Sequence, residues 1–236
     1  MVYTSLNKIW LCRSTDGSNW GNEILISDNA NVAGYPSIAV SNNLAYVVWQ
    51  DIAWAGGNGF DLAEIYMRSF DLSTNTLGST TEIASFTPNI QNFQANPVID
   101  GNWGSSYDYK MIAWREPNGI KVKNYTSPYG WSSISTVSGS NSYSYNPSIA
   151  YYSSHPYLLC WEDQYYGRIK YIEASWNYYW SFPNAADISP SNWTENSKPQ
   201  ITLVVNKPTI VWTSRNNIVE GGASVHVRQK NGSTWE

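Results

Sequence analysis

The chain has 236 residues, of which 15% are aromatic and 14% are charged, and its formal net charge is −4. This length suits one large all-β domain or two smaller ones. The charge argues against nucleic acid as a partner, because no block of Lys or Arg is available to neutralise phosphates. The sequence also contains no run of 18 apolar residues, so no membrane-spanning helix is predicted. Many aromatic, Asn and Ser residues favour sheets and turns over helices.

The first predicted elements are two short apolar runs, KIWLC and EILIS, on either side of the polar turn RSTDGSNW at residues 13–20. The runs predict two strands. In the turn, Ser14 and Asp16 are expected to accept hydrogen bonds from backbone N–H groups, and Gly17 to adopt a positive φ. Trp20 is expected to fold back as an apolar plug between neighbouring sheets.

Two cysteines, Cys12 and Cys160, lie inside apolar runs that read as strands. We interpret them as buried thiols, with a disulfide as the alternative.

Four later segments open alike, with a proline at the start of an apolar run. These prolines are spaced by 61, 50 and 52 residues and are Pro36, Pro97, Pro147 and Pro199. Each segment leads to a second apolar run with a tryptophan (Trp49, Trp114, Trp161 and Trp212), then to a third run. The first three segments reach a fourth, weaker run. Four short strands about every fifty residues indicate propeller blades.

We therefore predict an all-β fold, a β-propeller of four-stranded antiparallel blades in a single domain, with four to five blades and seventeen strands. The predicted divisions are a partial blade at 1–30, blades at 31–90, 91–140 and 141–191, and a partial blade at 192–236. Both ends offer a third strand of a blade, so we expect a segment of a larger ring. A complete ring with an unusual closure is the alternative.

The pattern S-x-D-G-x-x-W at Ser14–Trp20, with the repeated PSIA…VVWQD…IYMRS, resembles the Asp-box (BNR) repeats of sialidase-like β-propellers. This resemblance implies that the Asp box serves the fold and lies away from the catalytic face. It also implies, for the enzymes of the family, cleavage of sialic acid by three arginines that grip a carboxylate, a tyrosine paired with a glutamate, and an aspartate. The family's Arg-Ile-Pro signature is absent. Arg13, Arg68 and Arg228 share one repeat position, which indicates a structural role.

The loops after the second strands hold the charged side chains best placed for a site. We expect carboxylates and arginines there to rim one mouth of the propeller: Asp51, Glu116, Asp163 beside Glu162, Arg115, Arg168 and Arg215. A plainer interpretation is that they are solvated loop residues. The longest of these loops, at 51–64, adds the apolar faces of Trp54 and Phe60, and its oxygen ligands Asp51, Asp61 and Glu64 make a weak calcium candidate.

The loops between blades add aromatic residues among amides, chiefly Tyr143, Tyr145 and Trp193. Aromatic rings stack against sugar C–H faces, and amides bind sugar hydroxyls, so the mouth suits a glycan. Only two histidines are present, which argues against a zinc site or a Ser-His-Asp triad.

From these features we predict a non-catalytic propeller, extracellular or on a cell surface, that binds a glycan or a protein partner through its loop face. The alternatives are a fragment of a sialidase-like glycoside hydrolase and a structural scaffold in a surface assembly. No cofactor is predicted. Further propeller blades or an oligomeric neighbour are possible partners.

Overall fold

The computed structural model describes residues 1–28, 32–53, 62–88, 93–102, 108–139, 143–152, 157–176, 180–189, 195–215 and 223–236. All regular elements in these segments are β-strands. A search of the same segments finds no helix with the length and apolar character needed to cross a bilayer. The chain divides into two compact units, one of Met1–Ile99 with Trp103–Asp108, the other of Asp100–Asn102 with Tyr109–Glu236.

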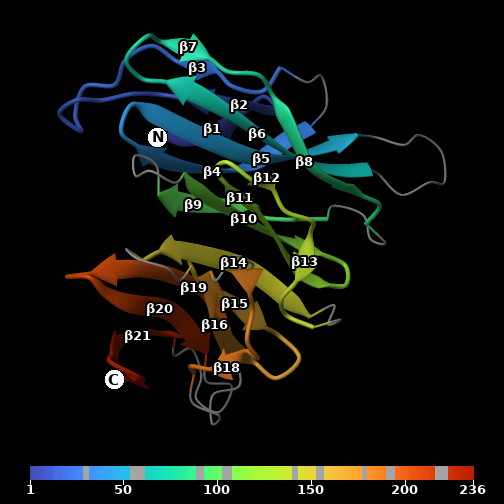
Figure 1. Ribbon diagram of the computed structural model, residues 1–236, viewed down its shortest axis with the longest axis vertical. Coiled ribbons are helices and arrows are strands. Elements are labelled where there is room, and N and C mark those ends of the chain that lie inside the picture. Colours follow the sequence, from blue (N-terminus) through green and yellow to red (C-terminus); the bar gives the residue numbers. More distant parts are fainter. Residues whose placement is uncertain are drawn as a thin grey trace. The chain divides into compact units, whose positions relative to one another are not determined.

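The first unit contains two antiparallel sheets (Figure 1). The N-terminal sheet has the order β1-β2-β3, with β1 at Val2–Ser5, β2 at Lys8–Leu11 and β3 at Ile24–Leu25. The next has the order β4-β5-β6-β7, and β8 also pairs with β6. Its strands are β4 (Val32–Ser41), β5 (Leu44–Ala53), β6 (Leu62–Asp71), β7 (Thr76–Leu77) and β8 (Thr81–Phe86).

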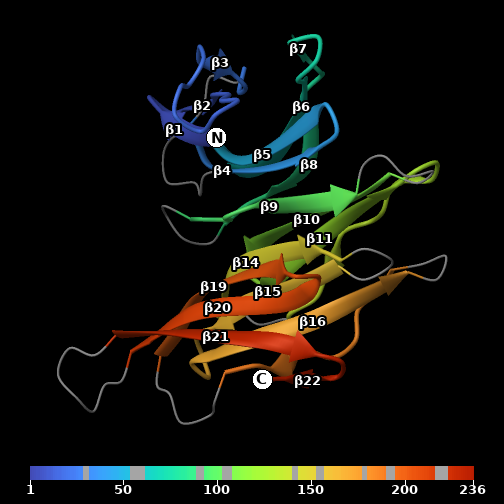
Figure 2. The same cartoon turned by 90° about the vertical axis from the view of Figure 1, so that its left-hand side faces the viewer.

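The second unit repeats this arrangement in three sheets (Figure 2). The strands of its first sheet are β9 (Val98–Asn102, of which the last three residues belong to this unit), β10 (Tyr109–Glu116), β11 (Gly119–Thr126), β12 (Gly130–Trp131) and β13 (Ser135–Thr136). Those of the next are β14 (Ser144–Tyr151), β15 (Tyr157–Asp163), β16 (Arg168–Trp176), β17 (Trp180–Ser181) and β18 (Ala186–Asp187). The last sheet has β19 (Glu195–Val204), β20 (Lys207–Arg215), β21 (Ala223–Asn231) and β22 (Thr234–Trp235).

Three of the four repeated prolines, Pro36, Pro147 and Pro199, lie at bulges inside the first strand of a sheet, whereas Pro97 directly precedes β9. The residue before each proline has a positive φ: 54° at Tyr35, 45° at Asn96, 49° at Asn146 and 53° at Lys198. In β4, β14 and β19 the register of pairing shifts at this point. Proline donates no hydrogen bond, and a bulge removes the need for one. We expected the first strands to begin at the proline, but β4, β14 and β19 begin three or four residues earlier and continue through the bulge.

The tryptophan of each second strand is fully buried: Trp49, Trp114, Trp161 and Trp212 are 0–2% exposed. Two of them stack on the residue opposite in the third strand. The Trp49 and Tyr66 rings lie 5.8 Å apart, and the Trp212 and His226 rings lie 5.3 Å apart. Each such side chain removes a large apolar area from water, which explains why the same residue type stands at this position in every full sheet.

The residue after this tryptophan links its sheet to the following chain segment. The Gln50 amide donates to the Phe93 carbonyl at 2.7 Å and accepts from the Ala95 N–H at 2.6 Å. The Arg115 guanidinium lies 3.7 Å above the Tyr145 ring. All three side chains that stand at this position in β5, β10 and β15, namely Gln50, Arg115 and Glu162, are buried. We call this position the latch position.

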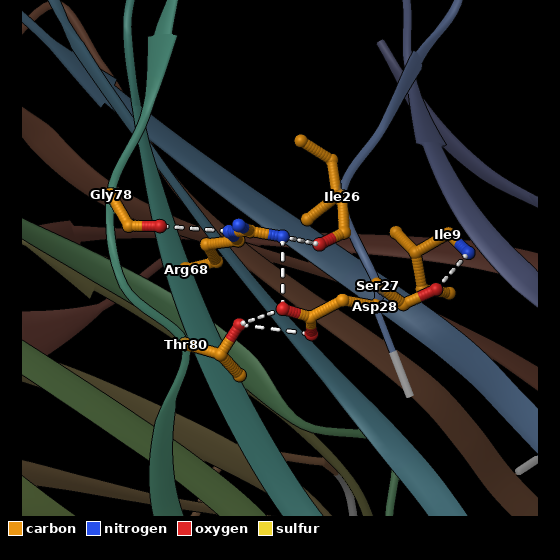
Figure 3. A network of polar contacts seen from close by, with 7 residues as sticks. All are labelled: Ile9, Ile26, Ser27, Asp28, Arg68, Gly78 and Thr80. Carbon is orange, nitrogen blue, oxygen red and sulfur yellow. Dashed lines mark hydrogen bonds and ion pairs between the residues drawn. The ribbon is translucent and has the colours of Figure 1, made fainter. Parts of the chain in front are cut away.

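Arg68 joins the two sheets of the first unit (Figure 3). Its guanidinium donates to the Gly78 carbonyl of its own sheet at 2.8 Å and to the Ile26 carbonyl beyond β3 at 2.9 Å. It also forms an ion pair with Asp28 at 3.3 Å, and Asp28 in turn accepts from the Thr80 hydroxyl. The structural role predicted for Arg68 is therefore confirmed.

The all-β propeller prediction is confirmed, while the strand count is too low. The described residues contain 22 strands rather than seventeen. The N-terminal β1 was not predicted, a short β22 follows β21, and the outer strands of three sheets are split into two short pieces. Cys12 and Cys160 are both free and buried, as expected, and burial raises the pKa of the Cys160 thiol. The single-domain and larger-ring expectations stay predictions.

Candidate functional site

A polar pocket of about 670 Å³ lies in the second unit, where β15 and β20 end and β16, β19 and β21 begin. We call it the β15–β20 pocket. Hydrogen-bonding side chains dominate its lining, which consists of Glu162, Gln164, Gly167, Asn196, Ser197, Lys198, Thr213, Ser214, Arg215 and Ala223. Its volume lies in the range typical of small-molecule sites.

Buried polar groups in the lining are held by hydrogen bonds. The Asn196 amide donates to the Gly167 carbonyl at 2.6 Å and accepts from the Trp212 indole N–H at 2.9 Å. The Ser214 hydroxyl lies 2.6 Å from Nε2 of His226. Asn196 and Ser214 are 2% and 1% exposed, so their positions are fixed by the protein rather than by solvent.

Glu162 is the carboxyl group of this lining and is 3% exposed. Three donors hold it: the Gln164 amide at 2.6 Å, the Asn146 amide at 2.9 Å and the Lys198 N–H at 3.2 Å. Asn146 and Lys198 are the positive-φ residues of the bulges in β14 and β19, so the bulges bring both donors to the carboxylate. Charge-assisted bonds of this kind fix its orientation.

Three tyrosines form an exposed cluster next to the pocket. Tyr143, Tyr165 and Tyr166 are 48%, 64% and 60% exposed. The Tyr143 and Tyr165 rings lie 5.4 Å apart, and the Tyr165 and Tyr166 rings lie 4.8 Å apart. The two neighbouring tyrosines stand between the pocket residues Gln164 and Gly167, and the Gln164 N–H donates to the Tyr143 carbonyl at 2.9 Å.

The three arginines expected at one mouth lie in three environments. Arg115 is buried with its guanidinium over the Tyr145 ring, and burial lowers the pKa of the guanidinium. Arg168 forms an ion pair with Asp187, which Lys170 also contacts at 2.5 Å, and it lies 5.8 Å from the centre of the Tyr166 ring. Arg215 lines the β15–β20 pocket. The expectation that the three arginines gather at one rim stays a prediction.

The other predicted residues are dispersed. Glu116 accepts from the Trp114 indole at 3.0 Å, and Asp163 is 5% exposed and receives a long contact of 3.4 Å from the Tyr166 N–H. Tyr145 lies under Arg115. The predicted residues Trp54, Phe60, Asp61 and Trp193 lie outside the described residues.

Asp51 and Glu64 face each other across the β5–β6 ladder of the first unit. Asp51 is fully buried. Burial raises the pKa of Glu64, and the nearby Glu82 and Asp51 raise it further, while a hydrogen bond from Tyr66 opposes this shift. Burial and Glu64 together raise the pKa of Tyr66 to about 12, so its hydroxyl stays protonated and can donate. The weak calcium candidate made of Asp51, Asp61 and Glu64 is not tested and stays a prediction.

The turn at 13–20 has the predicted hydrogen bonds. One Asp16 carboxylate oxygen accepts from the Ser18 N–H at 2.9 Å and from the Asn19 N–H at 2.8 Å, and the Ser14 hydroxyl accepts from the Gly17 N–H at 2.8 Å. Gly17 has a φ of 75°. The role expected for Trp20 is wrong: its side chain is 48% exposed and lines a surface pocket instead of filling an interior gap.

Comparisons with known proteins find similarity of fold. No protein-family model and no curated protein matches the sequence. A sialidase of Streptococcus pneumoniae is 13% identical over 92% of this chain and 34% of its own, with a TM-score of 0.57. A sialidase of Trypanosoma rangeli is 12% identical over 94% of this chain and 42% of its own chain, with a TM-score of 0.51. A β-1,3-galactosidase of glycoside hydrolase family 43 is 12% identical over 95% of this chain and 77% of its own chain, with a TM-score of 0.52.

The fold is a sialidase-like β-propeller. The prediction of a non-catalytic binding propeller is corrected by these comparisons, because the three similar structures named above are all glycoside hydrolases. The prediction had relied on the missing Arg-Ile-Pro signature and on the structural role assigned to Arg13, Arg68 and Arg228. Arginines that grip a carboxylate bear on the charge of the substrate, so these features do not argue against glycoside cleavage.

The pocket also contains residues that the sequence analysis did not single out: Gln164, Asn196, Lys198 and Ser214 in its lining, and Tyr165 and Tyr166 beside it. The run DQYYGR between β15 and β16 was a usable signal, because adjacent tyrosines in a short turn are exposed. The other residues take their places from the bulges and from strand pairing.

Proposed function

We propose that this chain is the propeller of a glycoside hydrolase and that the β15–β20 pocket binds its saccharide substrate. The observation that carries the proposal is Glu162, a carboxylate held by three donors in the lining of a polar pocket, with an exposed tyrosine cluster beside it. The shared fold supports the same class of enzyme.

The chemistry of the pocket suits a sugar. Amides, hydroxyls and a carboxylate match the alternating donors and acceptors of a pyranose or furanose ring. The exposed rings of Tyr143, Tyr165 and Tyr166 offer surfaces on which the C–H faces of a second sugar can stack. Apolar or aromatic surfaces with a few fixed polar groups are typical of small-molecule sites.

Glycoside cleavage uses two carboxyl groups around an oxocarbenium-like transition state. In the proposal, Glu162 is one of them, and its negative charge stabilises the positive charge that develops at the anomeric carbon. The second carboxyl group is sought among the carboxylates of the same unit that stand at the ends of second strands, Glu116 and Asp163.

The single arginine in the lining of the pocket favours a neutral sugar over sialic acid. Lys198 and Arg215 are its cations, Glu162 is its anion, and the described lining has one arginine rather than three. A single guanidinium can pair with hydroxyl groups but gives a weaker grip on a carboxylate than a triplet does. The proposed location stays extracellular or at a cell surface. The sequence N-Y-T at 124–126 is an N-glycosylation sequon, but Asn124 is 2% exposed and is therefore a poor acceptor for a glycan.

The test is turnover of fluorogenic glycosides by the purified chain, with β-galactoside and neuraminide probes and a broader panel of neutral glycosides. We expect turnover of a neutral glycoside. Glu162→Gln should lower kcat/KM by about 100-fold or more, as loss of a catalytic carboxylate does. Tyr165→Ala should raise KM by roughly 3- to 10-fold, the size of one lost stacking contact.

The matched control is Glu173→Gln, because Glu173 lies on β16 of the same sheet but pairs with Lys230 outside the pocket. It should leave kcat/KM unchanged. Amide variants of Glu116 and Asp163 in the same assay identify the second carboxyl group. Full activity in Glu162→Gln would remove the proposal, and no turnover of any glycoside would favour the structural scaffold.

A further inference from the structure

A second pocket, of about 700 Å³, lies in the first unit at the end of β6 opposite to Glu64. Two turns form it: the turn after β2, which carries Arg13, Asn19 and Trp20, and the turn after β6, which carries Asn75. We call it the Trp20 pocket. All of its lining residues lie in the described part of the first unit.

The first wall of the Trp20 pocket is held rigid from inside its own turn. Asp16 accepts two backbone N–H groups and the Asn19 amide, and these bonds lower the pKa of its carboxyl group. The Gly21 N–H donates to the Arg13 carbonyl at 2.8 Å, which closes the turn directly after Trp20. The indole is therefore presented by a fixed backbone, although 48% of its surface is exposed.

The second wall is held in the same way. The Asp71 carboxylate accepts from the Ser73 N–H at 2.8 Å and from the Thr74 N–H at 3.1 Å, and Asn75 follows with a φ of 57°. The Arg13 guanidinium donates to the Asn75 side-chain oxygen and ties the two turns together. Both walls are thus formed before any ligand arrives, which lowers the entropic cost of binding.

The lining combines the exposed indole of Trp20 and three further apolar side chains, Ile24, Phe70 and Leu77, with planar polar groups. Arg13, Asn19, Asn22 and Asn75 contribute guanidinium and amide groups, Ser14 and Thr15 contribute hydroxyls, and none of the lining residues is Asp or Glu. An indole face and paired planar donors and acceptors match the C–H face and the vicinal hydroxyls of a sugar ring. A lining without a carboxyl group has no acid or base for cleavage.

We propose that the Trp20 pocket is a non-catalytic saccharide-binding site that takes a segment of a neutral polysaccharide. It goes beyond the proposed function, because it lies outside the β15–β20 pocket and needs no turnover. For an enzyme on a polymeric substrate, such a site raises the local concentration of substrate by holding the chain at a second point.

The test is affinity electrophoresis of the chain in gels that contain soluble galactan, arabinan or xylan, with titration of the same polymers by NMR of the indole N–H signals. The Trp20 signal is assigned by its loss in Trp20→Phe. We expect at least one polymer to retard the wild-type chain and to shift this signal. Trp20→Ala should weaken retention by about tenfold or more, as loss of an aromatic anchor does in other sites.

The control is Tyr129→Ala, which removes another exposed aromatic side chain, 72% exposed, from a turn outside the Trp20 pocket. It should leave retention unchanged. Glu162→Gln should lose turnover and keep retention, whereas Trp20→Ala should lose retention and keep turnover of small fluorogenic glycosides. Retention by Trp20→Ala equal to that of the wild type, or no retention by any of the three polymers, would overturn the proposal whether or not the chain proves to be an enzyme.

Discussion

Glu64 shows how strongly a single side chain depends on its neighbours in this fold. It stands on β6 opposite the buried Asp51, and Tyr66 donates a hydrogen bond to it from the same strand. Burial is the largest cause of its raised pKa, and the like charges of Glu82 and Asp51 add to it. The folded chain therefore favours the protonated form of this carboxyl group more than the unfolded chain does.

The stability of the fold should accordingly depend on pH through Glu64. A carboxyl group with a raised folded pKa contributes stability that is present below its unfolded pKa, about 4.3, and is lost as the pH rises through its folded pKa. Glu64→Gln cannot ionise and keeps the hydrogen-bond acceptor for Tyr66. We expect this variant to be more stable than the wild type in urea unfolding at pH 7 and equal to it at pH 4.

Glu82→Gln provides the comparison, because it removes only one of the like charges near Glu64. It should shift the stability at pH 7 in the same direction but by less. A Glu64→Gln variant that differs from the wild type by the same amount at both pH values would show that ionisation of Glu64 is not responsible.

The latch position shows how elements are joined, since one position after the buried tryptophan serves three sheets with three residue types. Gln50 satisfies two backbone groups around Phe93, Arg115 stacks on Tyr145, and Glu162 accepts from Lys198. A link between sheets needs reach and a matched partner rather than a particular residue. At Glu162 the same position also reaches a pocket, so one site in the fold can serve both packing and chemistry.

Gln50→Ala tests the latch. It leaves the Phe93 carbonyl and the Ala95 N–H without the bonds that Gln50 supplies, and each buried unsatisfied group costs about 1–3 kcal/mol. We expect the free energy of unfolding to fall by about 2–4 kcal/mol in urea denaturation. Thr213 holds the equivalent position in β20 but is exposed, so Thr213→Ala should change the free energy of unfolding by less than about 0.5 kcal/mol. Equal effects from the two variants would remove the latch interpretation.

Elements were predictable from the sequence where a strong pattern marked them. The proline and tryptophan of each segment located the first two strands of the sheets, because both residue types have few places in a strand. The run VYTS of β1 carries no such marker, and the outer strands, such as Thr76–Leu77, are too short to show a period. The bulges were not predictable, because a positive φ at Tyr35 or Lys198 is imposed by sheet pairing.

At the scale of the whole molecule, the spacing of the segments was sufficient for the fold class. The candidate site was harder to predict from the sequence, because its residues come mainly from β15, β19 and β20 and meet only through strand pairing. The position of Arg215 at the end of a second strand was a usable signal, whereas Asn196 takes its place from its pairing with Ser214 and Lys198 from the bulge in β19. The functional prediction was wrong because the absent Arg-Ile-Pro signature was weighed against catalysis, although it bears on the charge of the substrate.

The most direct measurement is a crystal structure of the Glu162→Gln variant soaked with the glycoside that the wild-type chain turns over fastest. The account predicts a sugar ring in the β15–β20 pocket, in contact with the substituted side chain, Asn196 and Arg215, with a neighbouring ring or aglycone against the tyrosine cluster. A substrate bound elsewhere on the chain, with the β15–β20 pocket empty, would contradict it.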